Sequence, residues 1–284
     1  MNVGIVGLGY VGTALKEGFK HKHNIETYDL RDDLSTCLSI DDLVSKADLI
    51  FVCVPTPMNI DGSSNLSIVN DVIDKIATSN YIDNQIIIIK STVSPGTTEI
   101  LNDKYKKINI VFNPEFLTEA NFIEDFKNQN RIILGGPRDA TTILKQFYIT
   151  IFPKTPIIKT GSTYAEMVKY LANTFLATKV SFANEMKILC DKLSIDYDKV
   201  IEYAIYDKRL GSSHWSVPGP DGKPGFGGSC FPKDINALLH KASELGIDLK
   251  TIKSAWETNL DVRPEKDWEK LEGRAVTKPT KEIK

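Results

Sequence analysis

The sequence has few of the residues that would indicate a metal-binding or disulfide-stabilised protein. Its four cysteines, Cys37, Cys53, Cys190 and Cys230, are widely separated along the 284 residues. That spacing argues against both a zinc site and a disulfide framework. We therefore expect no metal site. Free thiols are typical of a reducing compartment, so we also expect a cytoplasmic protein.

The sequence also lacks a large net charge and long apolar segments. The formal net charge is -2, which gives no electrostatic reason to expect a nucleic-acid or membrane surface. The longest apolar runs have the length of strands, too short for a helix across a bilayer. The N-terminus lacks the basic region and apolar core of a signal peptide, so we expect none.

The first half of the sequence contains a series of short runs rich in valine and isoleucine. Helix-like stretches such as Gly12–Lys20 and Ile68–Ser79 lie between several of them. Continuous apolar strands that alternate with helices predict an α/β fold, a Rossmann-like doubly wound parallel sheet covered on both faces. The expected strands are Asn2–Val6, Ile25–Tyr28, Leu49–Val54, Ile86–Lys90, Ile108–Phe112, Ile132–Leu134 and Pro156–Lys159.

After Thr160 the pattern becomes helical. Apolar residues at helical spacing predict one long helix from near Ser162 to Leu193. Shorter helices are expected at Tyr197–Tyr206, Pro232–Leu245, Thr251–Asp261 and Pro264–Leu271. We therefore predict three parts: a dinucleotide-binding domain at 1–160, a helical central domain at 161–265, and a short helix with a polar tail at 266–284.

The first predicted strand runs directly into a G-x-G-x-x-G motif formed by Gly7, Gly9 and Gly12. Such glycines allow a tight turn, close approach of a pyrophosphate, and close packing of the following helix. Asp29, at the end of the second strand, is placed to bind a ribose 2′-hydroxyl, which favours NAD over NADP. Arg31 lies close by and keeps NADP open. Glycines in such a turn can also be purely structural.

Cys230 stands at the start of a predicted helix, within the segment from Gly225 to Asp234. Pro232 suits the first turn of that helix, and the helix dipole favours a thiolate at its N-terminus. Cys230 is therefore a candidate nucleophile, with Asp234 one turn further on. A buried, unreactive cysteine is the alternative.

Lys169 and Asn173 share one face of the long helix, nearly opposite its apolar stripe of Tyr164, Val168, Leu171 and Phe175. The pair forms either a solvated surface or a set of donors directed into a cleft between domains.

Several separate blocks, in their order along residues 1–265, resemble the UDP-glucose/GDP-mannose dehydrogenases. The resemblance is greatest to members that oxidise UDP-glucose. The segment Gly228–Asp234 looks more like the glucose and mannose enzymes than the N-acetylmannosamine ones. The blocks are Val6–Gly12, Cys53–Pro57, Lys90–Val93, Asn113–Glu119, Leu171–Asn173 with Lys169, Asp207–Gly211 and Gly225–Asp234.

The resemblance implies a four-electron oxidation of a sugar C6 alcohol to a carboxylate, with two NAD+ used in turn. Cys230 matches the family nucleophile, which forms a thiohemiacetal and then a thioester. Lys169 and Asn173 match residues that stabilise oxyanion charge. Asp234 and Thr92 match residues that position or activate water, and Glu115 matches an acid/base residue.

The resemblance also implies binding roles and a homodimer built on the long helix. Residues expected at the NAD site are Gly7, Leu8, Gly9, Tyr10, Val11, Gly12, Asp29, Val54, Pro55, Thr56, Ser91, Thr92 and Glu119. Residues expected at the nucleotide sugar are Glu115, Phe116, Leu117, Glu119, Lys169, Asn173, Phe226, Gly227 and Arg209, the last supplied by the neighbouring subunit. Singly, these residues also read as helix-start acids, turn hydroxyls or surface charges.

Two departures from the family bear on the substrate, and a third is Leu34, five positions after Asp29, where some relatives have a basic residue. Family members continue into a second nucleotide-binding domain that contacts the UDP, whereas this sequence ends at Lys284, soon after Pro264. The loop between Arg209 and Cys230 is longer than expected. Three alternatives to UDP-glucose oxidation therefore remain: a GDP-mannose 6-dehydrogenase, a non-catalytic NAD-binding dimer module, and a two-electron hydroxyacid dehydrogenase.

Overall fold

The structure is a computed structural model that describes residues 1–79 and 85–278. The chain forms two compact units. The first unit comprises Met1–Thr56 and Leu66–Lys169, and the second comprises Pro57–Asn65 and Tyr170–Lys284. This division differs from the domain ranges expected from the sequence, which stay predictions.

The first unit contains a seven-stranded sheet, formed by residues within the described ranges, in the order β2-β1-β3-β4-β5-β6-β7. All seven strands were predicted, with ends shifted by at most two residues. The strands are β1 (Asn2–Val6), β2 (Asn24–Tyr28), β3 (Leu49–Val52), β4 (Ile86–Ile89), β5 (Asn109–Phe112), β6 (Ile132–Gly135) and β7 (Ile157–Thr160). The helices of this unit are α1 (Tyr10–Phe19), η1 (Asp32–Leu34), α2 (Ile40–Lys46), α3 (Ser67–Thr78), α4 (Thr97–Lys104), α5 (Phe122–Lys127) and α6 (Arg138–Ile151).

The sheet is parallel except at one junction, which corrects the expectation of a parallel sheet throughout. β5 and β6 pair antiparallel through Phe112 and Gly135. The connection between them contains only the six-residue helix α5. The connection, residues 113–131, returns the chain to the edge at which β5 ends, so β6 runs in the opposite direction to β5.

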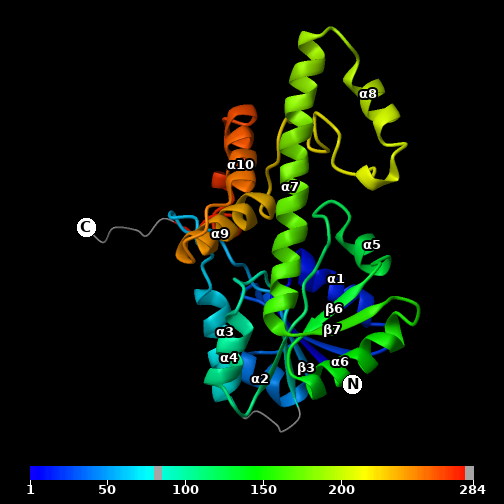
Figure 1. The fold of residues 1–284 in the computed structure, drawn as a ribbon. Helices are drawn as coiled ribbons and strands as arrows, with labels where there is room; N and C mark the ends of the chain where they lie inside the picture. The colour runs from blue at the N-terminus through cyan, green and yellow to red at the C-terminus, as the bar shows by residue number, and fades with distance from the viewer. Residues whose placement is uncertain (80–84, 279–284) are drawn as a thin grey trace. The chain divides into compact units, whose positions relative to one another are not determined.

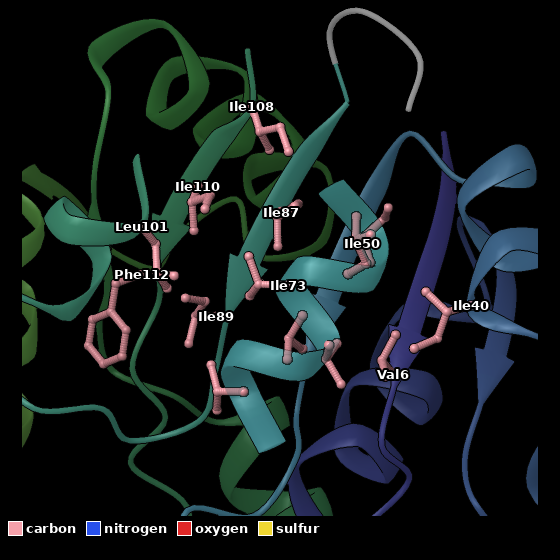
Figure 2. Packing of buried hydrophobic residues seen from close by; sticks show 14 of the residues in the cluster. Val6, Ile40, Ile50, Ile73, Ile87, Ile89, Leu101, Ile108, Ile110 and Phe112 are labelled. Atoms are coloured by element: carbon pink, nitrogen blue, oxygen red, sulfur yellow. The ribbon is translucent and has the colours of Figure 1, made fainter. Parts of the chain in front are cut away.

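Helices cover both faces of the sheet, as the continuous apolar strands predicted (Figure 1). Residues of alternate positions in each strand point to opposite faces. In β4, Ile87 and Ile89 pack with α2, α3 and α4, and Figure 2 shows them beside Ile73. Ile86 and Ile88 face the other way, toward α1 and α6. The first unit thus has a large apolar cluster on each side of its sheet.

The second unit is helical. Its helices are α8 (Tyr197–Ala204), η2 (Lys208–Leu210), α9 (Phe231–Glu244), α10 (Lys250–Val262), η3 (Asp267–Lys270) and most of α7 (Ser162–Lys192), whose first turns belong to the first unit. The long helix and the three that follow it were predicted. The helix expected at Pro264–Leu271 is instead the short 3₁₀ helix η3. Part of the expected polar tail, residues 279–284, lies outside the described residues.

The chain after η3 packs onto residues 57–65 within the second unit. Met58 N donates to Ala275 O at 2.8 Å, and Thr277 N donates to Met58 O at 2.9 Å. Trp268 is buried against Trp256, with ring centroids 5.2 Å apart. Across the described ranges 1–79 and 85–278, we find no helix with the length and apolar character needed to cross a membrane.

Candidate functional site

The glycine-rich turn between β1 and α1 has the space that a dinucleotide requires. Gly7 has a φ of +90°, and a Cβ there would lie 2.7 Å from the carbonyl oxygen of Cys53. A Cβ on Gly12 would lie 1.9 Å from the oxygen of Gly7. Gly9, by contrast, has nothing within 4 Å of its Cβ position. Gly7 and Gly12 are therefore needed for packing, whereas Gly9 leaves open space at the start of α1.

The N-terminus of α1 suits a phosphate. Helix α1 begins at Tyr10, and its N-cap residue is Gly9, which has no side chain to cap the first turn. The free N–H groups of a helix N-terminus attract anions, so this turn fits the pyrophosphate of NAD.

Asp29 sits at the edge of the same turn. Its Oδ2 accepts a hydrogen bond from Leu8 N at 2.6 Å, and its Oδ1 accepts one from Arg31 Nε at 3.1 Å. Partial burial opposes ionisation, but these hydrogen bonds outweigh it and hold the pKa of Asp29 below its usual value. An ionised carboxylate here can accept a hydrogen bond from a ribose hydroxyl, and it would repel a 2′-phosphate.

Five of the other residues expected at the cofactor follow the carboxyl ends of β3 and β4: Val54, Pro55, Thr56, Ser91 and Thr92. Ser91 Oγ donates to Val54 O at 2.7 Å, which ties the two strand ends together. Thr56, Ser91 and Thr92 are all buried. In an open α/β sheet, ligands bind outside the carboxyl ends of the strands, the edge where these residues gather.

Glu115 and Lys169 form a buried ion pair in the first unit. Lys169 Nζ donates to Glu115 Oε1 at 2.9 Å and to the Glu115 carbonyl at 2.7 Å. The two side chains are 11% and 4% exposed. Burial raises the pKa of Glu115, but Lys169 and the N–H of Leu117 overcome that effect and lower it. Glu115 is therefore a carboxylate at neutral pH, able to accept a proton.

Lys90 belongs to this cluster and was not among the expected site residues. Its Nζ donates to Asn113 Oδ1 at 3.1 Å, and burial lowers its pKa to about 8. With Glu115, Phe116 and Arg131 it lines a pocket of about 260 Å³ in the first unit. A lysine placed directly after four buried isoleucines is the sequence signal that could have revealed it.

In the second unit, Cys230 lies where the sequence predicted, immediately before α9. Asp234 N donates to Cys230 O at 3.0 Å, so the two residues are one helical turn apart. The Asp234 side chain is buried, accepts a hydrogen bond from Asn173 Nδ2 at 2.6 Å, and pairs with Lys233. The arrangement sets a carboxylate one turn from the thiol, with a fixed amide donor on one oxygen and an ammonium on the other.

Three residues expected to bind substrate have contrasting environments. Arg209 is 89% exposed on its side chain and paired with Asp207. The Phe226 ring is buried beside Ala177 and Ile235. Gly227 lies against the guanidinium of Arg263.

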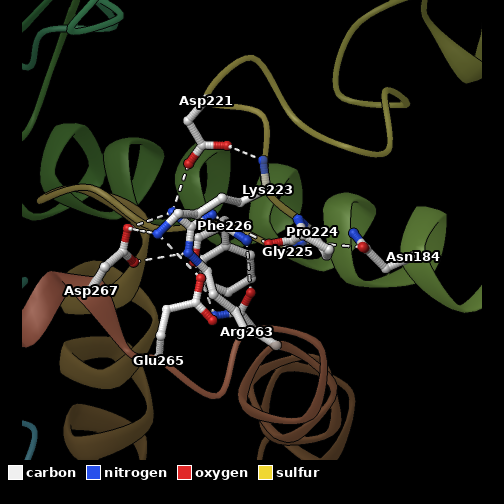
Figure 3. A network of polar contacts seen from close by, with 10 residues as sticks. Asn184, Asp221, Lys223, Pro224, Gly225, Phe226, Arg263, Glu265 and Asp267 are labelled. Carbon is white, nitrogen blue, oxygen red and sulfur yellow. Dashed lines mark hydrogen bonds and ion pairs between the residues drawn. The ribbon is translucent and has the colours of Figure 1, made fainter.

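The structure also brings together residues that the sequence did not single out. Asn184 and Asn259 hold the backbone of Gly225 and Phe226, and Arg263 holds the loop around them (Figure 3). These residues lie on α7 and at the end of α10, far along the chain from the loop. No local sequence pattern links them to it.

The expected catalytic residues divide between the units. Glu115, Lys169 and Thr92 belong to the first unit, whereas Asn173, Cys230 and Asp234 belong to the second. Each unit brings a pair into direct contact: Glu115 with Lys169, and Asn173 with Asp234.

Comparison with known proteins identifies the family. Residues 24–152 match the NAD binding domain of the UDP-glucose/GDP-mannose dehydrogenase family, and residues 163–261 match its central domain. UDP-glucose 6-dehydrogenase of Rickettsia bellii (strain RML369-C) is 36% identical over 225 residues, which are 77% of this chain and 50% of that relative. The chain thus spans about half the length of such relatives. The enzyme of the same name from Rickettsia typhi (strain ATCC VR-144 / Wilmington) is 31% identical over 91% of this chain and 67% of that protein.

Solved structures agree with the sequence comparison. A UDP-glucose dehydrogenase from the hyperthermophilic archaeon Pyrobaculum islandicum superposes with a TM-score of 0.80 at 29% identity. The match covers 91% of this chain and 67% of that one. The α/β architecture and the NAD-binding domain predicted from the motifs are therefore confirmed, and the chain belongs to the UDP-glucose/GDP-mannose dehydrogenase family.

Proposed function

We propose that the chain is an NAD-dependent nucleotide-sugar dehydrogenase that oxidises the C6 alcohol of UDP-glucose to the carboxylate of UDP-glucuronate. The observation that carries the proposal is the placement of Cys230 at the N-terminus of α9, one turn from the buried Asp234. A two-electron alcohol dehydrogenase has no use for a nucleophilic thiol, whereas a four-electron oxidation through a thioester requires one.

UDP-glucose is favoured among nucleotide sugars by the relatives. The curated proteins reported above are both named UDP-glucose 6-dehydrogenase. GDP-mannose remains the alternative substrate because the matched family description names both sugars.

The thiol chemistry follows from the position of Cys230. Bound NAD+ would accept the hydride in each of the two oxidations. The thiolate of Cys230, stabilised by the N–H groups of the first turn of α9, adds to the aldehyde carbon to give a thiohemiacetal. Oxidation of that adduct yields a thioester on Cys230, which water hydrolyses to release the carboxylate and regenerate the thiol.

The remaining roles are those that the family resemblance implies, and charge and hydrogen bonding support several of them. Asn173 and Lys233 hold Asp234 in a fixed orientation, so its carboxylate can accept a proton from the attacking water. Glu115, kept ionised by Lys169, serves as a base. Lys169 and Asn173 supply donors for oxyanion charge, and Thr92 orients water.

We further propose a homodimer formed through α7. On the part of α7 in the second unit, Leu171, Phe175, Phe182 and Leu189 follow one another at intervals of four and seven residues, and all are exposed. An apolar stripe at this spacing is the pattern by which two helices pack together. A second copy of the chain would cover it, and its exposed Arg209 would contact the sugar of the first copy. The free cysteines support a cytoplasmic location.

The test is the stoichiometry of the reaction. Purified protein is incubated with NAD+ and UDP-glucose, and the NADH formed is measured against the sugar nucleotide consumed. Two NADH per UDP-glucose are expected. One NADH per sugar would overturn the thioester scheme in favour of a two-electron dehydrogenase. No NADH with UDP-glucose or GDP-mannose, while NAD+ still binds, would favour a non-catalytic module.

A further inference from the structure

The loop that leads into Cys230 is held at its end by side chains of two helices in the second unit. Gly225 N donates to Asn184 Oδ1 at 3.1 Å. Phe226 N donates to Asn259 Oδ1 at 2.7 Å, and Phe226 O accepts from Asn259 Nδ2 at 3.1 Å. Asn259 therefore fixes Phe226 at both of its backbone polar atoms, four residues before the nucleophile.

Arg263, directly after α10, is the centre of a second set of contacts to the same loop (Figure 3). Its Nε and Nη2 donate to the two carboxylate oxygens of Asp267 at 2.8 and 2.6 Å. Nη2 also donates to Asp221 Oδ2 at 2.6 Å, and Nη1 donates to Pro224 O at 3.3 Å. The guanidinium therefore joins the loop, through Asp221 and Pro224, to η3, through Asp267.

Because the Arg263 side chain is buried, its charge depends on these hydrogen-bond partners. The Arg263 side chain is 1% exposed, whereas Asp221 and Asp267 are 48% and 26% exposed. A buried guanidinium must keep its partners because an unpaired charge in the interior is costly. Its planar fork matches one carboxylate in two places at once, which a lysine cannot do.

The guanidinium of Arg263 lies very close to the loop at Gly227. A Cβ at Gly227 would lie 2.5 Å from Arg263 Nη2 and 2.7 Å from Cζ. The Gly227 backbone does not have the left-handed φ that would itself require glycine. The lack of a side chain at this position is therefore explained by Arg263, which occupies the space.

These contacts lie next to the reactive residue. Gly227 and Gly228 separate Phe226 from Ser229, and Cys230 follows as the cap residue of α9. A shift of the Gly227 backbone would move the chain that enters α9, and with it the approach to Cys230.

We propose that Arg263 is a positioning residue: it fixes Phe226, Gly227 and Gly228 in the conformation that admits the nucleotide sugar to Cys230. The inference rests on the proposed function for the identity of the ligand. It assigns Arg263 no part in dinucleotide binding, because the glycine-rich turn belongs to the first unit.

The first experiment compares Arg263→Lys with Lys223→Ala in the full chain. Lys223 pairs with Glu265 and Asp267 at the exposed edge of the same network. For Arg263→Lys we expect KM for UDP-glucose to rise about tenfold, the change that follows loss of one hydrogen bond between charged groups. The Kd for NAD+ and kcat should change less than about twofold. Lys223→Ala should leave all three within about twofold. A loss confined to kcat, or a parallel loss of NAD+ affinity, would overturn the proposal.

The second experiment is a double-mutant cycle between Gly227 and Arg263. In the parent chain, Gly227→Ala forces its methyl group against the guanidinium, so KM for UDP-glucose should rise at least about tenfold. In an Arg263→Ala background the guanidinium is gone, and Asp267, whose Oδ1 lies 2.8 Å from the same Cβ position, has lost the guanidinium that holds it. The same substitution should therefore cost less than about threefold. Equal costs in both backgrounds would mean that the methyl group obstructs the sugar directly and would overturn the proposal. If Arg263→Ala does not fold, Arg263→Lys, which lacks the forked end, provides the second background.

A third measurement separates this inference from the proposed function. Hydrogen–deuterium exchange at Phe226 and Gly227, with alkylation of Cys230 by iodoacetamide, requires no turnover. Arg263→Lys should speed exchange at these two amides by about tenfold and change the alkylation rate, while exchange in α1 stays constant. Unchanged exchange and alkylation would overturn the role of Arg263 even in an active enzyme. Faster exchange in a chain that does not oxidise UDP-glucose would support Arg263 and reject the proposed function.

Discussion

The two units of this protein stabilise their residues in different ways. The first unit packs a large apolar cluster against each face of its sheet. Among its described residues, the second unit has smaller apolar clusters, with Tyr170, Ala237 and Leu238 buried in one and Ala177, Phe226 and Ile235 in another. Buried polar side chains such as Asn259 and Arg263 supply the remaining contacts.

The difference corresponds to a division of tasks. A sheet with apolar faces is a rigid support, and the dinucleotide turn needs only backbone groups and one carboxylate at its edge. The proposed thiol chemistry needs a loop of defined shape ahead of Cys230, and directional hydrogen bonds define a loop better than apolar packing does. Mutations should therefore affect function and stability differently in the two units.

The largest expected effect is on catalysis and comes from the second unit. Cys230→Ser should lower the rate of UDP-glucuronate formation by on the order of 10⁴-fold or more, because the hydroxyl is a far weaker nucleophile than the thiolate. The Kd for NAD+ should stay within about twofold, because the nucleotide turn is in the first unit. Steady-state product assays and NAD+ titration give both values. Cys190→Ser, at a buried cysteine of α7 in the second unit, is the control and should keep turnover.

The next effect is on stability and comes from the first unit. Phe51 is completely buried in β3 and packs against Phe19 and Phe147. Phe51→Ala should lower the free energy of unfolding by about 3–5 kcal/mol through lost burial and a cavity. Urea denaturation followed by circular dichroism measures it. Leu38→Ala, at a fully exposed position of the same unit, should change stability by less than about 0.5 kcal/mol. Similar values for the two variants would contradict the packing described here.

The matching substitution in the second unit removes a polar side chain. Asn259→Ala should cost about 2–4 kcal/mol, because it leaves the N–H and C=O of Phe226 buried without partners. The same urea titration measures the change. Thr258→Ala, which removes a surface hydrogen bond to Glu185, is the control and should cost less than about 1 kcal/mol. If Asn259→Ala cost no more than its neighbour, hydrogen bonding would not be what holds this loop.

The same contrast explains what could be predicted from the sequence. The strands of the first unit and the long helix of the second were predicted because apolar periodicity reports directly which residues are buried. The position of Cys230 at the start of α9 was predicted because a proline and glycines mark that helix start. The antiparallel β5–β6 junction was missed because strand direction depends on where a connection ends, which periodicity does not encode.

Residues that act through long-range contacts could not be predicted. Arg263 is followed by a proline and ends α10, so its local pattern is that of a helix terminus. Its role depends on Asp221 and Gly227, which only the folded chain brings to it. Lys90 was passed over because a lysine is expected in solvent, although its four preceding isoleucines already placed it at the end of a buried strand.

Lys90 also predicts a pH dependence that belongs to the first unit. Burial lowers its pKa from 10.5 to about 8, so below pH 8 the folded protein holds a costly buried charge. Between pH 8 and 10.5 the folded form releases this proton while the unfolded chain keeps it, so the cost disappears as pH rises. Lys90→Met should therefore gain stability relative to the parent by at most about 3 kcal/mol more at pH 7 than at pH 10. Urea titrations at both pH values measure this difference, and an equal offset at the two would contradict it.

The smallest expected effect is on the choice of dinucleotide. Asp29→Asn keeps an oxygen that can accept the hydrogen bond of Leu8 N but gives up the negative charge. The Kd for NAD+ should rise about tenfold, the equivalent of one charged hydrogen bond to the ribose. The Kd for NADP+ should fall, because the repulsion of its 2′-phosphate is removed while Arg31 remains beside it. Fluorescence titration with each dinucleotide gives the ratio, and Asp33→Asn in η1 is the control with a ratio like that of the parent. Since the change is confined to the first unit, the rate of Cys230 alkylation should not move. An altered alkylation rate with an unaltered ratio of the two Kd values would mean that Asp29 serves the fold and not the cofactor.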